Sequence, residues 1–272
     1  GSSYAGQKQM LPLKWVANTP AITADQQTLI YGSSNGDAVW FNPAIGYNTN
    51  RYHIGTTVRV QPTLASGVRN KSGLEREVVI TSSSDGTVIA LDLTQIAKLW
   101  SMKLTSPVET KIAYGTRSNI LDDEDYSRTS VFIAGTDQYV RAVDLHTGKQ
   151  RWNYLTSITL NDSPVFINDK VYQRIPTLGL ASYNAFPRKL SGEQLWLAHD
   201  VFGNVITTTK SGQLVCWDSD HSLLQIVDPR KGGVVTTLTI PNAKDVLADN
   251  ISNGSLCVLT NDNVLLRLVP RH

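Results

Sequence analysis

Short runs of alternating or β-branched apolar residues recur along the sequence, and clusters of Asn, Asp, Gly and Ser separate them. Clear examples are residues 28–32, 77–81, 130–135, 204–208 and 256–260. Apolar residues at helical spacing are almost absent. Short runs bounded by turn residues are typical of β-strands joined by tight turns. The pattern therefore predicts an all-β protein.

Two of these strand groups repeat one another at a fixed distance. The spacing is 52 residues for three pairs of positions: Asp85 and Asp137, Asp92 and Asp144, and Trp100 and Trp152. Residues 30–42 supply a first unit and residues 211–218 a fifth, whereas residues 171–196 and 256–269 form degenerate units. Self-similarity at such a period is the signature of an architecture in which each unit packs on the next.

Each unit follows the same order of strands and turns. One strand leads into an Asp-Gly or Asn-Gly pair, such as Asp85-Gly86, which tolerates the positive φ of a two-residue hairpin. The next strand ends on Asp or Asn, whose side chain can close a second turn. A fourth strand then carries a tryptophan, at Trp100, Trp152 and Trp196. We expect these large rings to pack against the neighbouring unit.

The chain of 272 residues accommodates six such units of about 45 residues, the size of a four-stranded propeller blade. We therefore predict a six-bladed β-propeller of four-stranded antiparallel blades, with seven or eight blades as the alternative. Trp15 resembles the fourth-strand tryptophans, and the last unit ends without one. Residues 11–17 are expected to complete the sheet of residues 243–270, which would close the ring and remove an open edge.

Residues 11–270 are expected to form one propeller domain. The sequence begins Gly1-Ser2-Ser3 without an initiator methionine, so residues 1–10 are interpreted as a tag remnant or linker. This interpretation leaves room for a lost signal peptide or lipid anchor. No run of about 18 apolar residues occurs, so no membrane insertion of this chain is expected.

Charge and composition narrow the choice of partners. Lys and Arg number 25 against 23 Asp and Glu, which gives a formal net charge of +2. This balance argues against nucleic acid as a partner, because polyanion binding needs a strongly basic surface. Hydrophobic residues make up 41% and charged residues 18%, a composition suited to a folded core. Recognition must therefore be local and carried by particular loops.

Residues 135–152 resemble the repeat of the quinoprotein-like (PQQ-like) β-propeller family. The resemblance rests on Asp137, Asp144, the Thr147-Gly148-Lys149 turn and Trp152, and residues 84–100 follow the same pattern without Thr-Gly-Lys. The family includes quinone-dependent dehydrogenases, the β-barrel assembly lipoprotein of Gram-negative outer membranes and the lumenal sensor domains of stress kinases. Its better-known members have more than six blades. Trp217-Asp218 resembles a WD repeat, but no Gly-His pair accompanies it.

The residues needed for redox chemistry do not come together in the sequence. A quinone-dependent dehydrogenase needs calcium held by oxygen ligands beside the cofactor and a nearby Asp as base. The dehydrogenases of the family often add adjacent cysteines, whereas Cys216 and Cys257 fall in different units. The five histidines are scattered without metal-ligand spacing. We assign no catalytic residue, metal ligand or cofactor.

Two kinds of charged loop are candidates for binding a protein. The acidic run contains Asp122, Asp123, Glu124 and Asp125, where the spacing of a calcium loop lacks its glycine. A solvated loop is the favoured interpretation, with partner docking as the alternative. The basic residues are Arg188, Lys189, Arg230 and Lys231, which fall where units four and five depart from the repeat. Such departures are often binding loops, although neutral drift explains them equally well.

The leading hypothesis is a non-enzymatic scaffold that docks a protein partner on one rim. The resemblance implies an extracytoplasmic location, periplasmic or envelope-associated, as in outer membrane assembly. One alternative is an enzyme that uses the central channel, either a divergent quinoprotein or a carbohydrate-acting propeller. Another is the sensor domain of a larger membrane-anchored protein.

Overall fold

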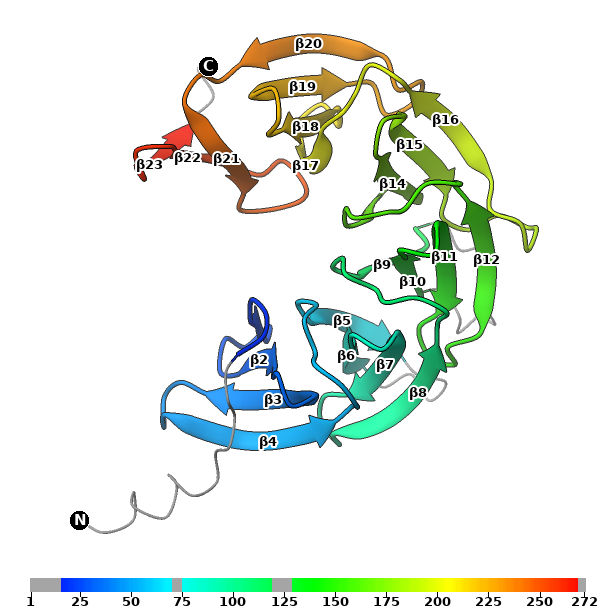
Figure 1. Ribbon diagram of the computed structural model, residues 1–272, viewed down its shortest axis with the longest axis vertical. Coiled ribbons are helices and arrows are strands. Elements are labelled where there is room, and N and C mark those ends of the chain that lie inside the picture. Colours follow the sequence, from blue (N-terminus) through cyan, green and yellow to red (C-terminus); the bar gives the residue numbers. More distant parts are fainter. Residues whose placement is uncertain (1–15, 70–74, 119–128, 269–272) are drawn as a thin grey trace. The chain divides into compact units, whose positions relative to one another are not determined.

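The computed structural model describes residues 16–69, 75–118 and 129–268. These residues form strands and turns, with no helix among them. The strands build six antiparallel sheets, five of four strands and one of three (Figure 1). The predicted all-β fold is therefore confirmed, and the sheets are those of a β-propeller with about six blades.

The chain divides into two compact units, residues 1–163 and residues 164–272. The first unit holds sheet 1 with β1 (Ala21–Ile22), β2 (Leu29–Gly32), β3 (Asp37–Asn42) and β4 (Tyr47–His53); sheet 2 with β5 (Thr63–Arg69), β6 (Glu75–Ser82), β7 (Thr87–Asp92) and β8 (Ala97–Lys103); and sheet 3 with β9 (Ala113–Thr116), β10 (Thr129–Ala134), β11 (Tyr139–Asp144) and β12 (Gln150–Leu155).

The second unit holds the other three sheets. These are sheet 4 with β13 (Val165–Ile167), β14 (Lys170–Ile175), β15 (Gly179–Asn184) and β16 (Gln194–Ala198); sheet 5 with β17 (Asn204–Thr208), β18 (Leu214–Asp218), β19 (Leu223–Val227) and β20 (Val234–Thr239); and sheet 6 with β21 (Ala243–Ala248), β22 (Leu256–Thr260) and β23 (Leu265–Leu268).

The turn between the second and third strands is the same in sheets 1, 2, 3 and 6. In sheet 2 the Ser83 N–H donates to the Thr87 carbonyl at 2.9 Å, and the Gly86 N–H donates to the Ser83 carbonyl at 3.0 Å. Only the last residue of each four-residue turn has positive φ, at Gly36, Gly86, Gln138 and Asn263. The predicted two-residue hairpin is wrong, because one left-handed residue suffices here and a non-glycine residue can supply it.

A β-bulge recurs between the third and fourth strands. In sheet 2, Ala90 pairs with Trp100 but the next residue, Leu91, pairs with Lys98. The register shifts at the corresponding step in sheets 1, 3, 4 and 5. The residue paired just before the shift is Trp100, Trp152, Trp196, Asn50 or Thr236. A bulge re-aims side chains by bending and twisting the strand, so all five occupy equivalent places.

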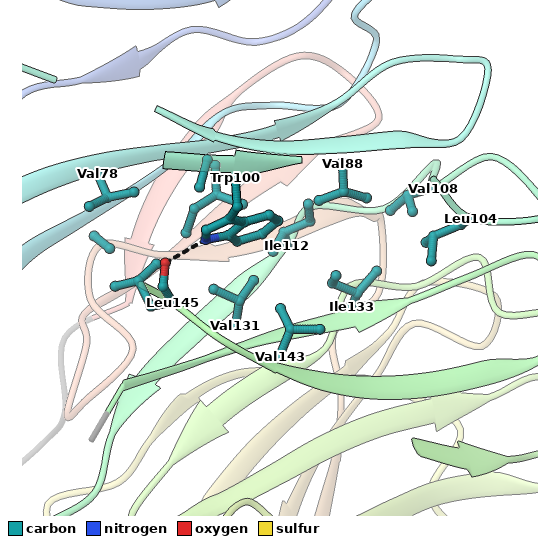
Figure 2. Packing of buried hydrophobic residues seen from close by; sticks show 13 residues of the cluster. Val78, Val88, Trp100, Leu104, Val108, Ile112, Val131, Ile133, Val143 and Leu145 are labelled. Carbon is teal, nitrogen blue, oxygen red and sulfur yellow. Dashed lines mark hydrogen bonds between the residues drawn. The ribbon is translucent and has the colours of Figure 1, made fainter. Parts of the chain in front are cut away.

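The tryptophan on the fourth strand of one sheet covers a turn of the next sheet. The Trp100 indole N–H donates to the Leu145 carbonyl at 2.6 Å (Figure 2). Its ring lies on Gly148, where a Cβ atom would fall 2.7 Å from the ring. In the second unit, the Trp196 indole N–H donates to the Pro229 carbonyl at 3.2 Å. A Cβ at Gly232 would lie 2.6 Å from that ring.

The expected place of residues 211–218 in the repeat is wrong. The Gly212 turn joins β17 and β18, the first and second strands, whereas the Gly86 turn joins the second and third. The counterpart of Asp144 is Asp228, since each residue's carbonyl accepts the N–H of a glycine four positions on. A local hairpin signal fits any pair of adjacent strands, so it cannot tell one from another.

The core consists of apolar layers between successive sheets of each unit. Val78, Val88 and Trp100 of sheet 2 pack with Val131 and Val143 of sheet 3 (Figure 2). Equivalent layers join sheets 1 and 2, sheets 4 and 5, and sheets 5 and 6. Each sheet therefore depends on its neighbours to bury its faces, as expected for a repeat architecture.

Most of the proposed closing segment, including Trp15, lies outside the described residues. Residues 1–10, interpreted as a tag remnant or linker, and residues 269–270, at the end of the expected domain, also lie outside them. Of residues 11–17, the described Val16 forms a bridge with Ser33, and the Ala17 N–H donates to the Gly32 carbonyl at 2.8 Å. Both contacts are with sheet 1.

We predict that Gly148→Ala lowers the free energy of unfolding by about 2–4 kcal/mol, because φ is +67° and the new methyl group meets the Trp100 ring. The control is Gly46→Ala, with φ +72° and no atom within 4 Å of its Cβ position. It should cost only about 1–2 kcal/mol of backbone strain. Urea unfolding of both variants measures the difference, and equal losses would contradict the tryptophan–turn contact.

Candidate interaction surface

The aspartates of the repeat close and brace turns. Asp92 Oδ1 accepts the N–H groups of Thr94 and Gln95 at 3.0 and 2.9 Å. Asp144 Oδ1 does the same for the N–H groups of His146 and Thr147 at 3.0 and 2.8 Å. These carboxylates satisfy turn N–H groups that would otherwise lack partners.

Two further repeat aspartates hold basic side chains. Lys103 lies 2.7 Å from Asp85, and its hydrogen bond holds the pKa of that carboxyl well below the ordinary value. Arg141 grips Asp137 with two hydrogen bonds of 2.8 and 2.5 Å. Burial raises the pKa of Asp137, but the bonds and charge of Arg141 outweigh this effect and lower it. Both carboxylates remain charged and act as structural anchors.

The acidic candidates Asp122, Asp123, Glu124 and Asp125 lie outside the described residues. They belong to the segment between β9 and β10.

The basic candidates occupy two loops of the second unit. Arg188 and Lys189 lie between β15 and β16, and Arg230 and Lys231 lie between β19 and β20. Both loops join the third strand of a sheet to the fourth, so they project from the same end of neighbouring sheets 4 and 5. All four residues are exposed, and the Arg230 side chain is 86% exposed. We call these four residues, two in each of the two loops, the basic turn pair.

Asp169 and Lys170, where β14 begins, form one hydrogen bond with each of the two loops. The Lys170 ammonium group donates to the Pro229 carbonyl at 2.7 Å. The Asp169 carbonyl beside it accepts the N–H of Ala185, which begins the other loop, at 3.0 Å. Burial lowers the pKa of Lys170, the charge of Asp228 raises it and that of Arg230 lowers it further. Sequence reasoning missed Lys170, because a lysine in a strand gives no local sign of such a contact.

The nearby carboxylates are engaged within their own loops. Asp228 Oδ1 accepts the N–H of Arg230 at 2.8 Å and lies 3.7 Å from its guanidinium Nε. Glu193 Oε2 accepts from the Asn184 amide at 2.8 Å. No salt bridge joins Arg188, Lys189 or Lys231 to another residue of the described ranges. Their charges therefore face solvent.

The two ends of the second unit differ in charge. The end that carries the basic turn pair has the basic residues Lys170, Arg188, Lys189, Lys210, Arg230, Lys231 and Arg267 against the acidic residues Asp169, Glu193, Asp228 and Asp249. The opposite end has Asp200, Asp218, Asp220, Asp245 and Asp262 against Arg174 and Lys244. A small net charge thus conceals a local separation of charge.

The described ranges contain no group of three or more His, Cys, Asp and Glu side chains that could hold a metal ion. Cys216 is buried and Cys257 is half-buried, and both thiols are free. Burial raises the pKa of the Cys216 thiol, which keeps it protonated. Where the structure describes the chain, no helix is long and apolar enough to cross a membrane.

The repeated turns, the bulged fourth strands and the tryptophan–turn contacts define a β-propeller of quinoprotein-like repeats. The family model for the outer membrane protein assembly factor BamB matches residues 57–238. This chain belongs to that family.

Solved structures agree on the fold. BamB from Moraxella catarrhalis superposes with a TM-score of 0.55 at 16% identity, over 92% of this chain and 81% of that chain. The computationally designed Ika8 protein superposes with a TM-score of 0.67 at 11% identity, over 92% of this chain and 69% of that one. No match was found among curated proteins.

We predict that Asp137→Asn lowers the free energy of unfolding by about 2 kcal/mol at neutral pH, because Arg141 loses a charged partner. Since the pKa of Asp137 is lowered in the folded state, this stabilisation is lost as the pH falls through the acidic range. The two proteins should therefore converge in stability on acidification. The exposed Asp220, 3.7 Å from Arg174, provides the control Asp220→Asn, which should change little.

Proposed function

We propose that this protein is a non-catalytic β-propeller scaffold that docks a protein partner during assembly of the outer membrane. Family membership supports this role, and the matched segment contains the whole basic turn pair. The proposed location is the periplasm or the periplasmic side of the outer membrane. Residues 11–270 are proposed to act as one domain.

The observation that carries the proposal is the fixed position of two charged loops on a rigid framework. Pro229 accepts hydrogen bonds from Trp196 and Lys170, so the turn that presents Arg230 and Lys231 is held at its base. Loops positioned in this way commonly bind partners, because little conformational freedom is lost on docking. Exposed arginines are frequent energetic anchors in protein interfaces. We propose the acidic residues 122–125 as a second contact.

We predict that replacing all four residues of the basic turn pair with Glu lowers the amount of folded outer-membrane β-barrel protein in the source bacterium. Charge reversal should repel a partner surface that the basic residues attract. Heat-dependent migration on gels measures the folded fraction, with immunoblotting to verify equal amounts of the variant. The matched control replaces Asp200, Asp220 and Asp262, at the opposite end, with Lys and should leave the folded amount unchanged.

Two outcomes would contradict the scaffold role. One is that deletion of the whole gene leaves outer-membrane proteins unaffected. The other is stoichiometric uptake of a quinone together with calcium by the purified protein, which would favour the alternative of a divergent quinoprotein enzyme.

A further inference from the structure

Strand β20 forms the free edge of sheet 5. It pairs with β19, and the order of strands in the sheet ends there. Every residue of β20 except Val234 is exposed, and the exposed fractions of Val235 and Leu238 are 53% and 51%. An edge strand presents a row of backbone N–H and C=O groups to which another strand can bind.

This edge lacks the charges with which exposed edges are normally protected. Residues 232–243 contain no Asp, Glu, Lys or Arg. By contrast, β4 carries Arg51, β8 carries Lys98 and Lys103, and β12 carries Arg151. Strand β16 has no charge either, but it is shorter and more deeply buried. Charged edge residues discourage pairing with other chains, so β20 is the least protected fourth strand described.

Strand β20 also lacks the tryptophan that the equivalent strands of sheets 2 and 4 carry. Thr236 occupies the place after the bulge that Trp100 and Trp196 fill in sheets 2 and 4. Strand β20 therefore carries a small polar side chain at this place. Its backbone remains in a regular antiparallel pair with β19 from Thr236 to Thr239.

One row of apolar side chains runs across sheet 5 and ends at this edge. Trp217 pairs with Leu224, and Leu224 pairs with Leu238. Trp217 and Leu224 are buried, whereas Leu238 is half exposed. Cross-strand neighbours stabilise a sheet through such contacts, so an apolar residue placed opposite Leu238 would continue the row.

We propose that β20 binds an extended, uncharged segment of a partner protein as an additional strand, with an apolar residue opposite Leu238. A charged segment would find no complementary group along residues 232–243. A second copy of this chain is disfavoured, because two six-residue strands, about 20 Å long, bury less than the roughly 1,000 Å² that a stable dimer needs. An extended peptide needs only the backbone pairing and one or two side-chain contacts.

The test uses a fluorescent synthetic peptide that carries the sequence of β20 between terminal lysines. Fluorescence anisotropy with the full chain should show saturable binding, and Leu238→Lys should weaken it at least tenfold. Leu155→Lys is the matched control, because Leu155 ends the fourth strand β12 and is 50% exposed. It should leave the affinity unchanged. Hydrogen exchange should slow at residues 234–239 when the peptide is bound.

The variant Val235→Lys should also weaken binding, and thermal unfolding verifies that each variant is folded. Absence of saturable binding at millimolar peptide would overturn the proposal. Equal losses in Leu238→Lys and Leu155→Lys would also overturn it, as would protection outside β20. If the unliganded protein forms a dimer that Leu238→Lys abolishes, the strand that binds β20 belongs to a second copy of this chain and not to a partner protein. The proposal does not depend on the basic turn pair, so its failure would leave the scaffold function untouched.

Discussion

The contact between a fourth-strand tryptophan and a turn of the next sheet connects most features of this fold. A four-stranded sheet has two apolar faces and cannot bury both alone. The bulge places Trp100 at the edge of sheet 2, and Gly148 in sheet 3 leaves room for its ring. Trp196 and Gly232 repeat the arrangement in the second unit. Sheet 1 has Asn50 at the place of the tryptophan. In the next sheet, sheet 2, the turn between the third and fourth strands has Ile96 at positive φ instead of a glycine. At both tryptophan contacts a glycine thus leaves room for the ring that covers its turn.

The sequence was sufficient to predict the strands, the repeat and the number of sheets, because alternation and turn residues are local signals. It was insufficient where the same signal fits more than one place. Residues 211–218 contain a Gly turn, a strand and an Asp, yet they belong to an earlier pair of strands than expected. The hydrogen bond from the Gly232 N–H to the Asp228 carbonyl and the contact of Gly232 with Trp196, from another sheet, identify Asp228 as the equivalent residue. The two-residue hairpin was wrongly predicted for a similar reason, because an Asp-Gly pair also fits a longer turn. In the structure the Asp85 carboxylate supports the four-residue turn by accepting the N–H of Thr87.

The candidate site was only partly visible in the sequence for the same reason. The basic turn pair stood out because the sequence of its two loops departs from the repeat pattern. Lys170 did not, because its role depends on the Pro229 carbonyl 59 residues away. The turn of Arg230 and Lys231 is a regular member of the repeat with basic residues at its tip, whose backbone hydrogen bonds match those of the Asp144 turn. Its distinguishing feature is therefore its charge, since the framework that holds it is shared.

Sheet 5 indicates how a repeat architecture acquires different surfaces without a change of fold. Side chains between the sheets are closely packed, so these positions tolerate little change. The turn tips and the outer edge make no such contacts and can diverge. In sheet 5 the tip carries Arg230 and Lys231, whereas the edge at Val235 and Leu238 is neutral. Gly232 and Gly233 lie in the sequence between the charged turn tip and the neutral edge strand. A charged partner surface and an extended neutral segment could therefore bind the same sheet without competing for the same side chains.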